Sequence, residues 1–468
     1  MIWFLLHAQK NYNILFLVKN PEADPVIHNN PGGRVMKRVV LLIAVLLMAV
    51  GAYAQTTVEF WHAMAGHNGE MVQIISDQFN ASQKEFKVVP VYKGSYVDTM
   101  NAGIAAFRAG QAPAIIQVYE VGTATMMAAK NAIKPVYQLM AENNMKWSSD
   151  IYIPAIKSYY STSDGRMISM PFNSSTAVMY YNKDAFRKAG LDPEKPPVTW
   201  PEFFDVAKKL KASGMEGGFT TNWISWIQLE NFCAWHNIPF GTRSNGFDGL
   251  DTQLVFNSPV VVRHFQNIYD LSKTGVFIYG GRENKANPLF TSGRVGLHFE
   301  SIGGYGNMKA TCKFDFGVAR LPYYPDVPGV PQNSCIGGAS LWVFNGRPAA
   351  EYKGVAEFFN FISKPEIQAL WHKETGYLPV TQAAYELTKS QGYYVTNPGL
   401  EVAIKQLTNK TPTPNSMGIR FGNMPIIREI EDQVWEEILS GKISVKDGLD
   451  KMVREGNKQL REFERLNK

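Results

Sequence analysis

The chain has 468 residues, of which 45% are hydrophobic, 19% charged and 12% aromatic, and its formal charge at pH 7 is +6. This length and apolar content allow two or three globular units with packed cores and argue against extensive disorder. The basic residues are spread along the chain rather than gathered in a stripe, so no nucleic acid is expected as a partner. The three cysteines form no CxxC pair and no cysteine–histidine cluster, which excludes a disulfide scaffold and a zinc ribbon.

Residues 36–54 have the pattern of a secretory signal peptide. Met-Lys-Arg opens the segment, an apolar run follows over 39–50, and the small residues Ala52 and Ala54 frame an A-x-A cleavage site. The alternative is a transmembrane anchor, which needs about 20 apolar residues. Because the second half of this uncharged stretch is small and polar, cleavage after Ala54 is the favoured interpretation.

Residues 1–35 precede the signal-peptide pattern. A signal peptide begins near its own methionine, so we expect Met36 to be the true start and residues 1–35 to be a mis-called upstream extension. The chain that follows from Gln55 carries nearly equal numbers of basic and acidic side chains. The sequence thus predicts an exported, nearly neutral globular protein.

Strand and helix patterns alternate after the expected cleavage site. Strands are predicted at 57–61, 86–91 and 114–118, with an amphipathic helix over 67–82 and another over about 100–107. This β-α-β-α-β order predicts a parallel sheet with right-handed crossovers.

The same alternation continues to the C-terminus. Later strands are predicted near 177–181, 295–299 and 340–344, and later helices near 201–212, 258–273, 350–362 and 444–464. Proline-rich loops at 192–201 and 321–331 are the candidate linkers between domains.

Glu120 follows the third predicted strand, in Gln117-Val-Tyr-Glu-Val-Gly122. Ligands of open α/β sheets bind beyond the carboxyl ends of strands, so this acid is a candidate ligand contact. It could equally be an ordinary loop acid, and spacing identifies no partner carboxylate for acid–base catalysis. The eight histidines stand singly, and the sequence contains no GxSxG or GxxxxGKS/T motif. Metal-dependent and nucleophilic catalysis are therefore not expected.

Trp223 and Trp226 are three residues apart, so a helix would present both indoles on one face. The pair could simply be core, or it could form a flat apolar wall for the carbon face of a polyol or sugar, or for an ammonium group. Two glycine pairs, Gly303-Gly304 and Gly337-Gly338, could let backbone N–H groups approach an anion, although such pairs are equally common in plain turns.

Arg420 and Arg428 flank a late, loop-like segment, Phe421-Gly-Asn-Met-Pro425. A guanidinium suits bidentate recognition of phosphate. Most arginines in such loops are merely solvated, so this feature alone leaves their role open.

Longer motifs carry a family resemblance. They are Phe60-Trp-His-Ala-Met64, Val91-Tyr-Lys-Gly-Ser-Tyr96, Asn101-Ala-Gly-Ile-Ala-Ala-Phe-Arg108, Gln117-Val-Tyr-Glu-Val-Gly-Thr-Ala-Thr-Met-Met127, Pro171-Phe-Asn-Ser-Ser-Thr176, Trp226-Ile-Gln-Leu-Glu-Asn-Phe232, Gly337-Gly-Ala-Ser-Leu-Trp342, Thr375-Gly-Tyr-Leu-Pro379 and Gly422-Asn-Met-Pro425. From about Thr56 to the C-terminus, the chain resembles the sn-glycerol-3-phosphate-binding proteins of bacterial ABC importers, within extracellular solute-binding protein family 1.

The resemblance implies an α/β fold of the type II periplasmic binding proteins, with two hinged lobes that close on a ligand. Each lobe is expected to contain a mostly parallel sheet flanked by helices. Lobe 1 would comprise 55–180 and 322–362, and lobe 2 would comprise 181–321 and 363–468. The chain would cross between the lobes near 179–183, 321–324 and 363–366.

The resemblance also implies ligand-binding roles at nine positions: Tyr96, Glu120, Ser175, Trp223, Trp226, Ser301, Gly338, Tyr377 and Arg428. Arg428 is the expected phosphate clamp, and Ser175, the glycine-loop N–H groups and the tyrosine hydroxyls would complete the phosphate shell. Glu120 would accept hydrogen bonds from glycerol hydroxyls, and the tryptophans would cover the carbon face. At Ser301 the chain reads Glu300-Ser-Ile-Gly instead of the family's usual Ser-Ser-Gly-Ser, and an acid beside the phosphate would be unfavourable unless it points away.

The implied function is that of the periplasmic substrate-binding component of an ABC importer. It would capture sn-glycerol-3-phosphate and glycerophosphodiesters such as glycerophosphocholine and deliver them, as a monomer, to a two-subunit membrane permease with its ATPase. No catalysis and no cofactor are expected. The main alternative is an oligosaccharide-binding protein of an ABC importer, which shares the fold and the aromatic wall but would not need Arg428 with two glycine loops. An exported phosphodiesterase would need a metal cluster or a paired acid and base.

Overall fold

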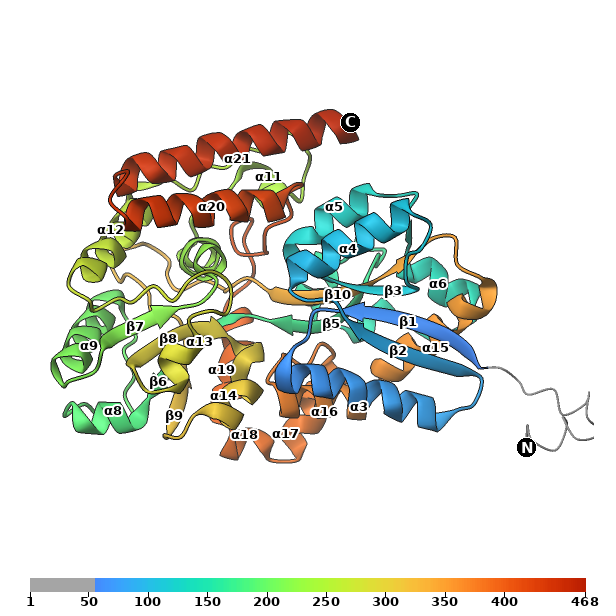
Figure 1. The fold of residues 1–468 in the computed structure, drawn as a ribbon, viewed down its shortest axis with the longest axis horizontal. Helices are drawn as coiled ribbons and strands as arrows, with labels where there is room; N and C mark the ends of the chain where they lie inside the picture. Colours follow the sequence, from blue (N-terminus) through green and yellow to red (C-terminus); the bar gives the residue numbers. More distant parts are fainter. Residues whose placement is uncertain (1–54) are drawn as a thin grey trace, which may run out of the picture. The chain divides into compact units, whose positions relative to one another are not determined.

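The computed structural model describes residues 55–468 (Figure 1). The upstream extension expected at 1–35 and the signal peptide expected at 36–54 lie outside the described residues. Within 55–468, every helix is too short or too polar to cross a membrane.

The first sheet has the strand order β2-β1-β3-β10, and β4 and β5 pair with successive parts of β10. Its strands are β1 (Thr56–His62), β2 (Phe86–Tyr92), β3 (Ile115–Tyr119), β4 (Ile133–Lys134), β5 (Met170–Ser175) and β10 (Gly337–Phe344). Helices α3 (Gly66–Ser82) and α15 (Ala349–Ile362) cover one face, and α4 (Tyr96–Arg108) covers the other (Figure 1). Met71, Ile75 and Phe79 recur every fourth residue, so α3 presents one apolar face to this sheet.

The second sheet has the order β7-β8-β6-β9. Its strands are β6 (Ala177–Asn182), β7 (Gly217–Thr221), β8 (Val295–Ser301) and β9 (Phe316–Ala319). Helix α9 (Trp200–Ala212) packs on β7 and β8. Its first turn is fixed by a capping box between Thr199 and Glu202, which satisfies backbone N–H groups that the helix itself leaves unpaired.

Helices connect and cover the two sheets. In chain order the remaining elements are η1 (Glu120–Gly122), α5 (Thr123–Ala128), α6 (Val136–Glu142), η2 (Ser149–Ile151), α7 (Pro154–Tyr159), α8 (Lys183–Lys188), η3 (Ser225–Asn231), α10 (Phe232–Trp235), the left-handed turn α11 (Thr242–Gly246), α12 (Pro259–Lys273), α13 (Asn287–Thr291), η4 (Ile302–Gly304), α14 (Tyr305–Thr311), α16 (Pro365–Thr375), α17 (Gln382–Ser390), α18 (Tyr393–Thr396), α19 (Pro398–Leu407), α20 (Met424–Leu439) and α21 (Val445–Asn467). Helices α20 and α21 pack against each other and against α12 (Figure 1).

Both sheets are mixed, so the expectation of mostly parallel sheets is wrong. Strand β1 is parallel to β2 and β3, as the β-α-β-α-β pattern predicts, and β7 is parallel to β8. Strand β10 runs antiparallel to β3, β4 and β5, and β6 runs antiparallel to β8 and β9. The chain leaves the first sheet after β5 and returns to it only at β10, so β10 enters without the crossover helix that a parallel neighbour requires.

The lobe boundaries can be compared with the sheet membership of each strand. Strand β6 already belongs to the second sheet, so the first crossing lies at Thr176, slightly before the expected 179–183. Helix α16 contacts both α3 beside the first sheet and α14 beside the second. We propose that the lobes otherwise divide as expected, near 322 and 363.

Gly218 allows helix α9 to lie directly on strand β7. A Cβ atom at Gly218 would lie 2.2 Å from the backbone oxygen of Ala207, whereas a Cβ atom at Gly217 would meet the end of the Ile278 side chain at 2.7 Å. A side chain can rotate away, but the helix backbone cannot. We expect Gly218→Ala to lower the free energy of unfolding by about 1–3 kcal/mol and Gly217→Ala to lower it less, in urea unfolding. Equal losses in the two variants would contradict this packing.

Candidate ligand-binding site

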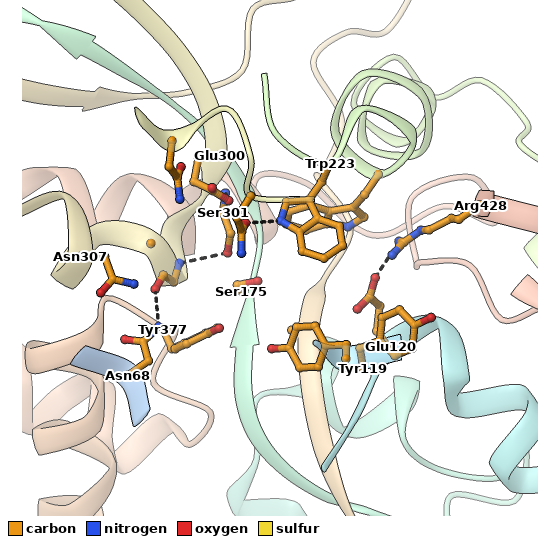
Figure 2. A pocket seen from close by; sticks show the side chains of 17 residues that line it. Asn68, Tyr119, Glu120, Ser175, Trp223, Glu300, Ser301, Asn307, Tyr377 and Arg428 are labelled. Atoms are coloured by element: carbon orange, nitrogen blue, oxygen red, sulfur yellow. Dashed lines mark hydrogen bonds and ion pairs between the residues drawn. The ribbon is translucent and has the colours of Figure 1, made fainter. Parts of the chain in front are cut away.

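A cavity of about 100 Å³ lies among residues contributed by both sheets (Figure 2). All nine positions expected to bind a ligand line it: Tyr96, Glu120, Ser175, Trp223, Trp226, Ser301, Gly338, Tyr377 and Arg428. The strands explain this convergence, because Glu120 follows the carboxyl end of β3 and Ser175 and Ser301 end β5 and β8. Ligands of α/β sheets bind at such strand ends.

A buried ion triad forms one end of the cavity. Arg428 Nη2 donates to Glu120 Oε1 at 2.7 Å, and its Nε and Nη2 donate to the two carboxylate oxygens of Glu230 at 2.6 and 2.8 Å. All three side chains are buried. Burial raises the pKa of Glu120 while Arg428 lowers it. Burial also opposes the charge of Arg428, but the two carboxylates outweigh it and hold the pKa of the guanidinium well above its usual range.

The structure corrects the expected surroundings of Arg428. The residue lies in helix α20, which begins at Met424, and not in a loop. Its guanidinium is also already paired with two carboxylates, so its charge is satisfied within the protein. Among residues 55–468, only Nη1 of this side chain has no protein partner, and that nitrogen can still donate to a ligand oxygen.

The tryptophan pair lines the cavity for a different reason than the spacing suggested. Trp223 does not belong to the helix, because its φ is 43° and the π-helical turn η3 begins only at Ser225. Its backbone N–H donates to Glu283 O (3.1 Å), and its indole Nε1 donates to Asn284 Oδ1 (2.6 Å). These two hydrogen bonds hold the strained residue in place. Trp226 lies in η3, and its indole packs so closely on Gly337 that a Cβ atom there would lie 2.3 Å away.

Hydroxyl groups and small residues form the other end of the cavity. Tyr96 stacks on Tyr119 with ring centroids 5.5 Å apart, and its hydroxyl accepts from Asn173 Nδ2 at 2.8 Å. Tyr377 covers Gly303, where a Cβ atom would lie 2.4 Å from its ring. Burial raises the pKa of both Tyr96 and Tyr377, so these hydroxyls stay protonated and can donate.

Gly338 is the one glycine lining this cavity whose backbone conformation requires a glycine. Its φ is +86°, and a Cβ atom would lie 1.8 Å from Asn173 O. No side chain fits this close approach, and the backbone of Gly338 itself lines the cavity.

Glu300 points to the cavity rather than away from it. Its carboxylate accepts from the backbone N–H of Ser301 (2.5 Å) and from Asn222 Nδ2. The side chain is 2% exposed, and burial raises its pKa from 4.5 to about 7, against the lowering effect of these two hydrogen bonds. An acid beside Ser301 was expected to be compatible with phosphate binding only if its carboxylate pointed away from the ligand. In the structure Glu300 instead lines the cavity.

Five lining residues were not predicted from the sequence: Asn68, Tyr119, Asn284, Asn287 and Asn307. Glu300 and the Gly303-Gly304 pair, which were noted from the sequence, also line the cavity. Tyr119 lies inside the motif that contains Glu120, so its neighbour could have indicated it. The four asparagines carry no such signal, because each stands outside any motif and comes to the cavity only through the packing of α3, α13, α14 and the loop between α12 and α13.

The triad predicts a large loss of stability when its cation is removed. Arg428→Met leaves two buried carboxylates without a counter-charge and should lower the free energy of unfolding by about 3–5 kcal/mol at pH 7 in urea. The matched control is Arg282→Met, because Arg282 pairs with Glu436 in a more exposed position (2.7 Å) and should cost about 1 kcal/mol or less. Equal costs for the two variants would argue against a buried triad.

The match to known proteins is close along most of the chain. A family model for bacterial extracellular solute-binding proteins matches residues 75–401. The sn-glycerol-3-phosphate-binding periplasmic protein UgpB of Pectobacterium atrosepticum is 49% identical over 427 residues, which are 91% of this chain and 96% of that protein. The protein of the same name from Yersinia pseudotuberculosis is 50% identical over 433 residues, 92% of this chain and 98% of its own length.

Solved structures confirm the two-lobed fold. UgpB of Mycobacterium tuberculosis, crystallised with glycerophosphocholine, has a TM-score of 0.72 at 20% identity, over 88% of this chain and 98% of that one. The maltose-maltodextrin binding protein of Alicyclobacillus acidocaldarius has a TM-score of 0.66 at 18% identity, over 85% of this chain and 99% of that one. By its sequence relatives and its fold, the chain belongs to the bacterial extracellular solute-binding proteins, and within them to the sn-glycerol-3-phosphate-binding periplasmic proteins.

Proposed function

We propose that this protein is the periplasmic substrate-binding component of an ABC importer for sn-glycerol-3-phosphate and glycerophosphodiesters such as glycerophosphocholine. The observation that carries the proposal is the convergence of all nine expected residues on one small cavity. The names of the relatives at about half identity support the ligand class. A two-subunit membrane permease with its ATPase would receive the ligand from the monomeric protein.

The two ends of the cavity suggest how such a ligand would lie. Figure 2 shows Arg428 and Glu120 at one end and Ser301 and Tyr377 at the other, with Ser175 between them. In our proposal the phosphate occupies the hydroxyl end, where Ser175, Ser301, both tyrosine hydroxyls and the Gly338 N–H can donate. Such donors suit phosphate oxygens because each can supply a charge-assisted hydrogen bond.

The glycerol hydroxyls would lie at the triad. Glu120 can accept from them, and the free Nη1 of Arg428 can donate to them. Arg428 is then mainly a positioning residue for Glu120, and this role replaces the phosphate clamp expected from the sequence. The indoles of Trp223 and Trp226 would cover the carbon face, and the buried Trp226 Nε1, which has no partner within 55–468, could donate to a ligand oxygen.

Closure would assemble this site from both lobes. Glu120 follows a strand of the first sheet, whereas Glu230 lies in η3, which follows β7 of the second sheet. The guanidinium of Arg428 binds both carboxylates, so the complete triad requires the two lobes to be together. We propose that ligand and triad stabilise the same closed arrangement.

Binding without turnover is part of the proposal. The carboxylates at the cavity are already engaged, Glu120 by Arg428 and Glu300 by Ser301 and Asn222. Within the described 414-residue stretch from 55 to 468, no group of three or more His, Cys, Asp or Glu side chains is placed to hold a metal ion. An oligosaccharide is the weaker candidate, because the relatives at about half identity are named for sn-glycerol-3-phosphate.

Isothermal titration of residues 55–468 tests the proposal. We expect sn-glycerol-3-phosphate or glycerophosphocholine to bind with a Kd of about 1 μM or lower, and maltose not to bind. Ser175→Ala removes one donor at the proposed phosphate end and should weaken binding about tenfold or more. Ser390→Ala, on an exposed helix end, is the matched control and should leave the affinity unchanged. Binding of maltose alone would refute the proposed ligand class.

A further inference from the structure

Glu300 has no role in the binding scheme above, although it lines the cavity. Its carboxylate lies next to Ser301, a donor of the proposed phosphate end, and is almost completely buried. Within the described part of the chain, only the Ser301 N–H and the Asn222 amide bind it. Among residues 55–468, no lysine or arginine forms an ion pair with Glu300.

The groups that face Glu300 do not neutralise it. Tyr180 faces it from β6 and Tyr377 faces it from the loop after α16, and burial raises the pKa of both phenols, so both are neutral. On its own strand, His298 is bound to Asn287 Oδ1 through Nε2 (3.1 Å), and burial lowers its pKa to about 3. None of these groups supplies a positive charge.

The charges at the rest of the cavity also give no positive excess. Arg428 is the one cation among the described residues that line it, and Glu120 and Glu230 both bind that cation. The triad therefore carries one net negative charge when both acids are ionised, and Glu300 adds another. A phosphate monoester carries a charge of about −1.5 to −2 at pH 7, because its second pKa is about 6. A phosphodiester carries one negative charge, and a diester with an ammonium group is neutral overall.

Within the proposed function, we infer that Glu300 is a specificity-determining residue that makes the cavity favour phosphodiesters over the dianionic monoester. The carboxylate repels the second phosphate charge at the end of the cavity where that charge would lie. A diester substituent replaces this second charge with a neutral bond, so the diester escapes the repulsion that acts on that charge.

The selectivity should depend on pH in a defined direction. Protonation of Glu300, whose pKa burial raises to about 7, removes the repulsion, and protonation of the monoester near pH 6 removes the second phosphate charge. The affinity for the monoester should therefore increase as the pH falls from 8.5 to 5.5. The affinity for the diester should change much less, because its own charge does not titrate in this range.

Titration calorimetry with three ligands separates charge from size. The ligands are sn-glycerol-3-phosphate, its methyl diester and glycerophosphocholine, measured at pH 5.5, 7.0 and 8.5 with residues 55–468. At pH 8.5 we expect the wild-type protein to bind the methyl diester at least about tenfold more tightly than the monoester, a factor that corresponds to about 1.4 kcal/mol. At pH 5.5 this ratio should shrink severalfold.

Two variants test whether Glu300 is the cause. Glu300→Gln keeps the side-chain length, and Glu300→Ser restores the serine usual in this family. If one variant fails to fold, the other still tests the inference. At pH 8.5 either variant should bind the monoester about tenfold more tightly than the wild type and should flatten its pH profile. The matched control, Glu366→Gln on the exposed surface, should leave both unchanged.

The outcomes distinguish this inference from the function on which it rests. If the phosphate compounds bind but the monoester-to-diester ratio and the pH profile are the same with and without Glu300, the inference is overturned and the proposed function stands. If none of the three compounds binds wild type or variants, the proposed function is overturned and the inference falls with it.

Discussion

A guanidinium held between two buried carboxylates is the interaction on which the rest of the site depends. Removing three charged groups from water costs several kcal/mol per ion, and only well-made ion pairs offset that cost. Arg428 meets this condition with hydrogen bonds of 2.6 to 2.8 Å to Glu120 and Glu230. Because Glu120 follows β3 and Arg428 lies on α20, the triad fixes one end of the cavity across the two sheets.

The triad also determines how the other end must work. Its two carboxylates neutralise Arg428, the one cation that lines the cavity among the described residues. An anion must therefore be held by hydroxyl and backbone N–H donors. Donors of this kind bind one negative charge well but offer little compensation for a second. For this reason a single buried acid, Glu300, can decide between ligands that differ by one charge.

Much of this structure could be predicted from the sequence, and the failures have physical causes. The strand–helix alternation predicted β1 to β3 and their parallel order, and motif resemblance located nine cavity residues. Trp223 reached the cavity through a left-handed turn and not through a shared helix face. Glu230 was not predicted as a partner of Arg428, because the two are 198 residues apart and one sequence carries no signal for such a contact. The direction of Glu300 depends on Asn222, another distant residue.

The position of the phosphorus atom in a crystal structure of residues 55–468 with bound glycerophosphocholine or sn-glycerol-3-phosphate would test this account most directly. We predict that the phosphorus lies among Ser175, Ser301 and the Gly338 N–H, while Arg428 keeps both of its carboxylate partners. A phosphate bound directly to the Arg428 guanidinium, with Glu120 or Glu230 displaced, would contradict the account.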